Sequence, residues 1–224
     1  MIFQIPDYPS GYYEGITLIL WFVAAGLMFL STIMLVIKAI KSEGRSPKLM
    51  YLAYGIFYIF FGLTRILYIV AVYNPDSYDF FTTLGYISQN LSLISILYVL
   101  ETHIVKSTKK IFLILTVIAF FISLISLIGL VSREITLAIG FILLPFSGGA
   151  ILILYLIVSI KSTGTLRKSA IGLFIGSLMI FAAQILDSEM FIGLIYPIIP
   201  LILEITAVIM IFGVIIFTFS QVKV

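Results

Sequence analysis

Seven long apolar segments follow one another along the chain, and short polar connections separate them. They cover Ile16–Ile40, Leu49–Tyr73, Phe80–Leu100, Ile111–Val131, Ile135–Ile160, Ser169–Leu186 and Phe191–Phe219. A helix needs about 20 apolar residues to cross ~30 Å of hydrocarbon. The runs are continuously apolar and lack an alternation of period two, so helices rather than strands are expected. The pattern predicts an all-α integral membrane protein with seven transmembrane helices.

Composition supports this class of protein. Hydrophobic residues make up 62% of the 224 residues and charged residues only 10%, whereas a soluble domain carries about 25% charged residues. A soluble fold would therefore have too little polar surface to present to water. We expect a multi-pass protein of the cell membrane with the lipid bilayer as a partner, and the net charge of +3 does not indicate nucleic acid. Cysteine is absent, which excludes disulfides and Cys-ligated metals.

The positions of the charges predict an orientation. Eleven of the 13 Lys and Arg residues fall in alternate connections or after the last span: Lys38, Lys41, Arg45, Lys48, Lys106, Lys109, Lys110, Lys161, Arg167, Lys168 and Lys223. The other side holds mainly acidic residues, namely Asp7, Glu14, Asp76, Asp79, Glu134, Asp187 and Glu189, with Arg133 as its cation. The positive-inside rule makes the basic side cytoplasmic, so the N-terminus is predicted outside and the C-terminus inside. The basic loops are also expected to attract anionic lipid.

A weak internal repeat is one interpretation of the single heptahelical domain. The motif Ile-Lys-Ser-X-Gly follows both the first and the fifth span. Extending the comparison places Arg65 opposite Gln184 and Gln89 opposite Glu204. Chance similarity between Ile- and Leu-rich segments is the alternative. In a 3+1+3 arrangement of the domain 1–224, the half-repeats would be 16–104 and 135–221, and 111–131 would be the linker helix.

A few polar side chains interrupt the apolar spans, and an ionisable group at that depth is costly without a partner or a function. Glu204 follows Phe191 by thirteen residues, about 20 Å along a helix and near the bilayer midplane. The long side chain of Arg65 is its predicted counter-ion. One interpretation is a polar cavity that opens outward, and the other is a structural ion pair that fixes helix register. The predicted ligand-binding residues are Arg65, Gln89, Asn90, Gln184, Glu204, Tyr68, Tyr86 and Tyr196.

Two prolines precede Glu204 in the seventh span. Pro197 and Pro200 lack N–H donors and would kink a continuous helix there. They form a candidate hinge, and the alternative is a tolerated bend near the outer end of the helix.

Small residues predict helix contacts without any further function. The serine stripe of the third span and the glycine pair of the sixth span are typical of close helix packing. These residues are Ser88, Ser92 and Ser95, and Gly172 and Gly176.

The inner end of the third span carries Glu101 and His103. His103 is the only histidine, which excludes a zinc site built from several histidines. Glu101 is expected to contact a nearby lysine. No catalytic residue, metal site or cofactor is predicted, because no nucleophile or pair of catalytic carboxylates stands out, and we expect the protein not to be an enzyme.

The predicted topology resembles two seven-helix families, the microbial rhodopsins and the SWEET-type sugar carriers with their Pro-Gln loop relatives. Rhodopsins hold retinal on a lysine of the seventh helix, but here that span has no lysine before Lys223. The proline signature of the carriers is also missing. The triplet Glu101-Thr102-His103 lies where G-protein-coupled receptors have an acidic-Arg-aromatic triplet, but the arginine is absent. The resemblance covers topology only, so it assigns no residue roles.

The expected function is binding and transport of a small or amphipathic molecule through the outward-facing cavity. The first alternative is a sensor or receptor that signals through partners at the basic cytoplasmic loops. The second is a structural or lipid-binding membrane protein, in which the polar pair is only a clamp.

Overall fold

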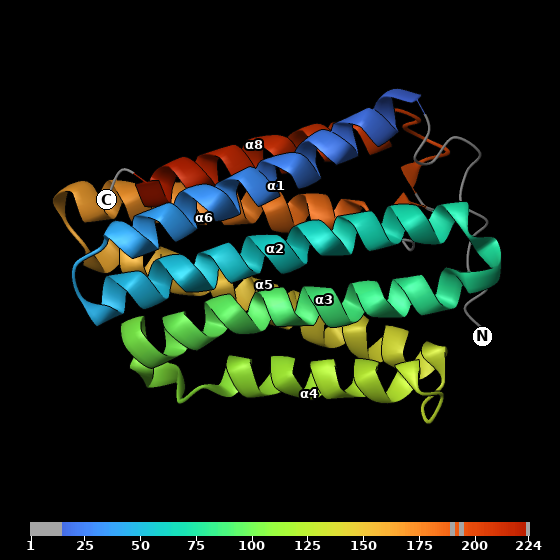
Figure 1. Cartoon of the computed structure of the whole chain (residues 1–224), viewed down its shortest axis with the longest axis horizontal. Coiled ribbons are helices and arrows are strands. Elements are labelled where there is room, and N and C mark those ends of the chain that lie inside the picture. The colour runs from blue at the N-terminus through green and yellow to red at the C-terminus, as the bar shows by residue number, and fades with distance from the viewer. Residues whose placement is uncertain (1–14, 189–190, 193–194, 223–224) are drawn as a thin grey trace. The chain divides into compact units, whose positions relative to one another are not determined.

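The computed structural model describes residues 15–188, 191–192 and 195–222, and the secondary structure in this part of the chain is helical (Figure 1). Seven of the described helices have 17 residues or more, and six of these are long and apolar enough to cross a membrane. The protein is therefore all-α, and its helices are those of a polytopic membrane protein. Four residues used in the charge pattern, Asp7, Glu14, Glu189 and Lys223, lie outside the described residues.

The chain forms two compact units. Unit 2 comprises Met28–Ile157, and unit 1 comprises Met1–Leu27 with Val158–Val224. Helix α1 (Gly15–Lys41) contributes its first half to unit 1 and its second half to unit 2. Helix α5 (Arg133–Lys161) belongs to unit 2 except for its last turn.

Unit 2 is built around a helical hairpin. Helix α2 (Arg45–Tyr73) and helix α3 (Tyr78–Val99) are joined by a tight turn that contains the 3-10 helix η1 (Pro75–Ser77). Helix α4 (Ile111–Leu127) packs on the other side of α3, and Figure 1 shows these three helices side by side.

The serine stripe on α3 joins the hairpin together. Ser88 donates a hydrogen bond to the carbonyl of Phe60 at 2.7 Å, and Ser95 donates one to the carbonyl of Ala53 at 3.0 Å. Both carbonyls belong to α2, so the helix contacts predicted for these two serines are confirmed.

In unit 1, helix α6 (Gly164–Leu186) packs closely against helix α8 (Ile202–Val222). A Cβ atom added at Gly172 would lie 2.9 Å from Cβ of Ser220, and one added at Gly176 would lie 2.7 Å from the backbone N of Phe217. The Ser169 hydroxyl donates to the carbonyl of Ser220 in the same contact. The predicted glycine face of the sixth span is therefore confirmed as a helix contact.

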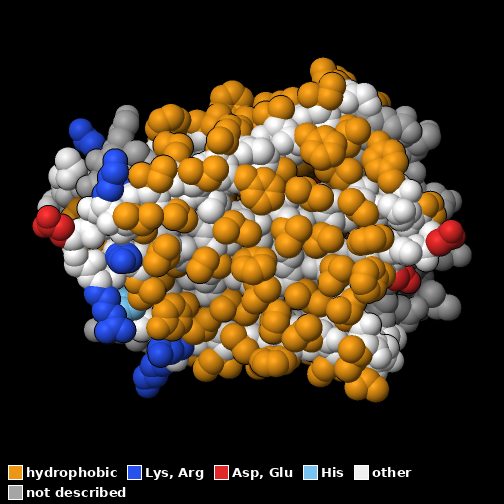
Figure 2. Space-filling model, viewed as in Figure 1, with side chains coloured by type: hydrophobic (Ala, Val, Ile, Leu, Met, Phe, Trp, Pro, Cys, Tyr) orange, Lys and Arg blue, Asp and Glu red, His pale blue; other side chains and the backbone are white. Residues whose placement is uncertain are grey.

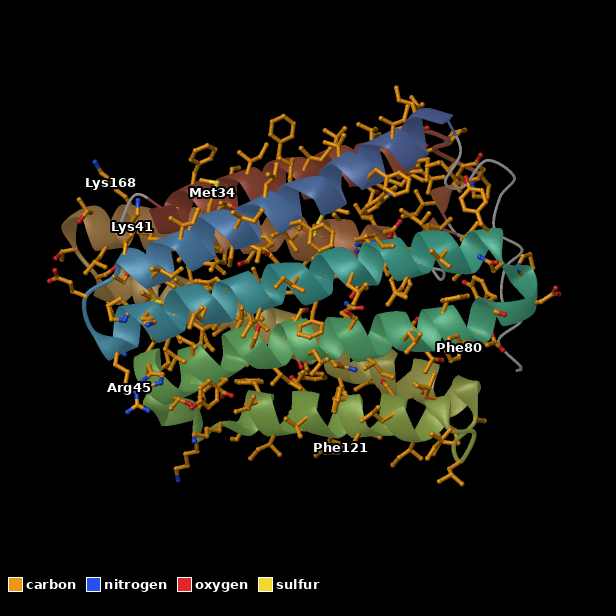
Figure 3. The ribbon with its side chains drawn as sticks, in the orientation of Figure 1. Met34, Lys41, Arg45, Phe80, Phe121 and Lys168 are labelled. Atoms are coloured by element: carbon orange, nitrogen blue, oxygen red, sulfur yellow. The ribbon has the colours of Figure 1, made fainter. Side chains whose placement is uncertain are left out.

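Large apolar side chains lie on the outside of the helices, where a bilayer would meet them. Met34, Phe80 and Phe121 are 43%, 51% and 54% exposed, and all three point outward in Figure 3. Hydrophobic side chains cover most of the face shown in Figure 2. In unit 2, Lys41 and Arg45 lie at the opposite end of the helices from the α2–α3 turn (Figure 3).

The seventh apolar segment differs from the prediction. Residues 196–201 form turns, and α8 begins only at Ile202. Pro197 and Pro200 therefore precede the helix instead of kinking it, and Glu204 lies in the first turn of α8 rather than deep within a longer helix. The physical reason is that two prolines three residues apart remove two of the N–H groups that a continuous helix would need.

The fourth helix is shorter than predicted. Helix α4 ends at Leu127, although the apolar run continues to Val131. Gly129 adopts a φ of +78°, its N–H bonds the carbonyl of Ser126 at 2.9 Å, and Leu130 N–H bonds the carbonyl of Ile125 at 3.2 Å. This pair of bonds around a left-handed glycine is a Schellman motif, which ends a helix irrespective of its hydrophobicity.

The start of α4 is held by a carboxylate from the neighbouring helix. After Val99, α3 continues as a π-helix over Leu100–Ile104, which contains Glu101. The Glu101 side chain is 1% exposed, and its Oε2 accepts a hydrogen bond from the backbone N–H of Leu113 at 2.7 Å. Leu113 lies in the first turn of α4, whose N-cap residue Lys110 makes no side-chain capping bond. Glu101 thus satisfies a backbone donor of α4, and its expected contact with a nearby lysine stays a prediction.

We predict that Glu101→Ala lowers the free energy of unfolding by about 1–3 kcal/mol, because a partly buried backbone N–H loses its acceptor. Unfolding of the purified protein in mixed detergent micelles measures this loss. Hydrogen exchange should accelerate at the first turn of α4. Glu43→Ala is the control, since Glu43 is an exposed carboxylate at the same end of unit 2. Equal stability of the two variants would contradict the capping role.

Candidate functional site

Helix α2 carries a fully buried cation in the half nearer to the α2–α3 turn. Arg65 has a relative exposure of 0%, and its guanidinium carbon lies 5.5 Å from the ring centroid of Phe61 and 6.0 Å from that of Tyr68. Cation–π contacts of this kind stabilise a guanidinium that has left water. Positions 61, 65 and 68 recur at intervals of four and three residues, so one stripe of α2 brings these three side chains together.

Helix α3 supplies the polar side chains that meet this stripe. The Tyr68 hydroxyl donates a hydrogen bond to Oε1 of Gln89 at 3.3 Å. The rings of Tyr68 and Tyr86 meet edge to face at 5.9 Å. Four of the predicted site residues, Arg65, Tyr68, Tyr86 and Gln89, therefore form one connected cluster between α2 and α3, which we call the Arg65 cluster.

A glycine allows the two helices to approach each other at this point. The carbonyl of Gly85 accepts a hydrogen bond from Thr64 at 3.4 Å. A Cβ atom added at Gly85 would lie 2.8 Å from Cδ1 and 3.2 Å from Cζ of Tyr68, and closer still to Cε1. Gly85 thus forms the notch that seats the Tyr68 ring. Sequence reasoning missed it, because an isolated glycine in a helix carries no signal about which side chain faces it.

Asn90, which follows Gln89 in the chain, points elsewhere. Its Nδ2 donates a hydrogen bond to Ser123 of α4 at 3.3 Å, and its buried Oδ1 has no hydrogen-bond partner among the described residues. A second polar contact, Thr116 with Ser147 at 2.6 Å, joins α4 to α5. Asn90 therefore helps to hold α4 and lies outside the Arg65 cluster.

Unit 1 holds the remaining predicted site residues. Glu204 is half-buried in the first turn of α8, and its Oε1 accepts a hydrogen bond from the Thr17 hydroxyl of α1 at 2.9 Å. Its Oε2 atom is buried and has no hydrogen-bond partner among the described residues. Gln184 and Tyr196 are half-buried. The predicted ion pair of Glu204 with Arg65 stays a prediction.

Within the described residues, no three His, Cys, Asp or Glu side chains gather as a potential metal site. The Arg65 cluster combines a buried charge, an amide and two tyrosine rings, which are groups that can bind a ligand by charge, hydrogen bonding and stacking. No family model, curated protein or solved structure matches the chain.

Proposed function

We propose that this polytopic membrane protein binds and transports a small or amphipathic molecule. The observation that carries the proposal is the complete burial of Arg65 inside an apolar helix, beside the ring of Tyr68, whose hydroxyl bonds Gln89. Ionisable groups inside membrane helices are rare, and they mark substrate or ion pathways. A purely structural role would be served as well by an apolar residue, which requires no desolvation of a charge.

The proposed orientation follows from the charges at the helix ends. In unit 2, Lys41 and Arg45 lie at one end and Asp76 lies at the α2–α3 turn at the other end. The positive-inside rule makes the basic end cytoplasmic in a cell membrane. Tyr68 lies three residues nearer than Arg65 to the α2–α3 turn, which supports access to the cluster from outside. The basic end would also hold anionic lipid headgroups.

Flux through proteoliposomes tests the transport proposal. We suggest three phenyl compounds that differ in charge: benzenesulfonate, benzyltrimethylammonium and phenyl glucoside. At least one of these compounds should enter liposomes that contain the wild-type protein faster than it enters protein-free liposomes. Arg65→Gln should abolish this increase in the uptake rate. The control variant Arg45→Gln removes an exposed cation at the basic end and should transport normally. If a probe binds but none of the three crosses the membrane, the transport proposal is contradicted and a receptor-like role is supported.

A further inference from the structure

A hydrogen bond between two buried tyrosines joins α2 to α5. The Tyr155 hydroxyl donates to the Tyr54 hydroxyl at 3.0 Å, and both side chains are 2% exposed. Tyr54 precedes Arg65 by eleven residues of α2, or about 16 Å of helix rise, so the bond lies toward the basic end of unit 2. A single bond between neutral groups contributes only modestly to stability, so it can open and form again.

Tyr54 belongs to a buried stripe of α2 that also contains Arg65. The stripe advances by three or four residues at each step, so its side chains share one face of the helix. Tyr58, Phe61 and Arg65 are each 0% exposed, and the Phe61 ring lies 5.5 Å from the guanidinium carbon of Arg65. Tyr155 therefore contacts the same face of α2 that carries Arg65, at the end nearer to the basic residues.

Helix α5 is weakened in the segment that ends six residues before Tyr155. Pro145 lies inside the helix and lacks the N–H of a regular helical hydrogen bond. Ser147 donates to the carbonyl of Leu143 at 2.9 Å, and such a bond to the preceding turn often bends a helix. A Cβ atom added at Gly149 would meet no atom within 4 Å, so close packing does not hold this position. We call this segment, Pro145 to Gly149, the α5 hinge.

The α5 hinge is anchored to α4, and the helix beyond it is held at Tyr155. Oγ1 of Thr116 and Oγ of Ser147 lie 2.6 Å apart, and both side chains are buried. Beyond the hinge, the buried residues of α5 in unit 2 are Ala150, Ile151, Leu154 and Tyr155. A bend at the hinge would move this buried face together with Tyr155, while Ser147 stays at α4.

We propose that the Tyr54–Tyr155 bond is a latch, and that α5 bends at its hinge when the latch opens. The closed latch holds α5 against Tyr54. The open latch lets water and a ligand reach the stripe between Tyr54 and Arg65 from the basic end. This inference rests on the proposed transport function and gives its path an inner gate, but the opening of the latch can be measured without transport.

Thiol labelling in nanodiscs tests the latch. The chain has no cysteine, so Leu154→Cys creates a single thiol at a position that is 1% exposed. With a charged methanethiosulfonate reagent, Tyr155→Phe should raise the labelling rate by about three- to tenfold, because the loss of one neutral hydrogen bond shifts an opening equilibrium by about this factor. Tyr54→Phe removes the same bond from the other helix and should give a similar increase. Unchanged rates in both variants would overturn the latch.

Two controls separate a latch from a bond that is only structural. Tyr51→Phe removes a hydroxyl from the same stripe but keeps the ring that Lys38 contacts at 4.8 Å, and it should leave the labelling rate unchanged. Ala207→Cys places the thiol in α8 at a position that is 0% exposed. Tyr155→Phe should not accelerate labelling there. Equal acceleration at positions 154 and 207 would mean general loosening and would contradict the latch.

A glycine substitution tests the hinge. Gly149→Ala should slow labelling of Leu154→Cys by about two- to fivefold, because alanine favours the straight helix over the bent one by about this factor. Gly26→Ala is the matched control, since an added Cβ in α1 would also meet no atom within 4 Å. It should leave the rate unchanged. An effect of the same size from both substitutions, or no effect from Gly149→Ala, would overturn the hinge.

The same variants distinguish failure of the latch from failure of transport. If Tyr155→Phe accelerates labelling but none of the three phenyl compounds enters proteoliposomes, the latch stands and transport fails. If a compound enters but neither tyrosine variant changes the labelling rate, transport stands and the latch fails.

Discussion

Replacing Arg65 with alanine is expected to lower the free energy of unfolding by about 3–5 kcal/mol if the predicted ion pair with Glu204 is present, because the change leaves a carboxylate without its counter-ion in a low-dielectric environment. Removal of the guanidinium also takes away the group that packs against the rings of Phe61 and Tyr68. Unfolding in mixed detergent micelles, followed by circular dichroism, measures the loss.

The double variant Arg65→Ala with Glu204→Ala tests the pair itself. It should be more stable than Arg65→Ala alone, since the carboxylate that lacks a partner is then also absent. Arg65→Ala with Glu43→Ala is the matched control, because Glu43 is exposed and its removal should add independently. If the effects of Arg65→Ala and Glu204→Ala are simply additive, the predicted ion pair does not exist and the carboxylate depends on its bond with Thr17 alone.

Replacing Gly176 with alanine is expected to separate α6 from α8 and to lower the free energy of unfolding by about 3 kcal/mol. The added Cβ would lie 2.7 Å from the backbone N and 2.8 Å from Cα of Phe217. A change of rotamer cannot move these backbone atoms, so one helix must shift. Thermal unfolding of the purified variant measures the effect.

Gly149→Ala is the matched control for this prediction. Gly149 also lies inside a long helix, α5, but an added Cβ at this position would meet no atom within 4 Å. Alanine should therefore stabilise α5 by roughly 0.5–1 kcal/mol, as it does at an unconstrained helical site. Shifts of the unfolding temperature in the same direction for both variants would contradict the packing role of Gly176.

Hydrophobicity and turn residues were sufficient to predict most helices. The polar connection near Arg45 and the Asn74–Pro75 turn lie where the apolar runs stop, so both ends of α2 could be placed to within a few residues. The pairing of small residues was also readable, because Gly172 and Gly176 are four residues apart and share a helix face. These features depend on residues that are close together in the sequence, so the sequence alone could predict them.

The features that could not be predicted from the sequence depend on which residues face each other in space. The segment before α8 is as hydrophobic as α8 itself. Hydrophobicity alone therefore could not show that this segment forms turns and that the helix begins at Ile202. Gln89 and Asn90 are neighbours in sequence, but they point toward α2 and α4 respectively, and polarity alone grouped them together. The notch at Gly85 becomes visible only when the ring of Tyr68 is placed against it.

The late start of α8 has a consequence for how the protein sits in a bilayer. Irregular backbone that faces lipid does not occur within the hydrocarbon region, and the turn residues Ile198 and Leu201 are 78% and 65% exposed. Such a segment is suited to the headgroup region, where apolar side chains dip into the acyl boundary while carbonyls meet water. We expect these two side chains to act as an interfacial anchor. Partitioning of this anchor, rather than the length of α8, would then set the depth of the Glu204 carboxylate below the membrane surface.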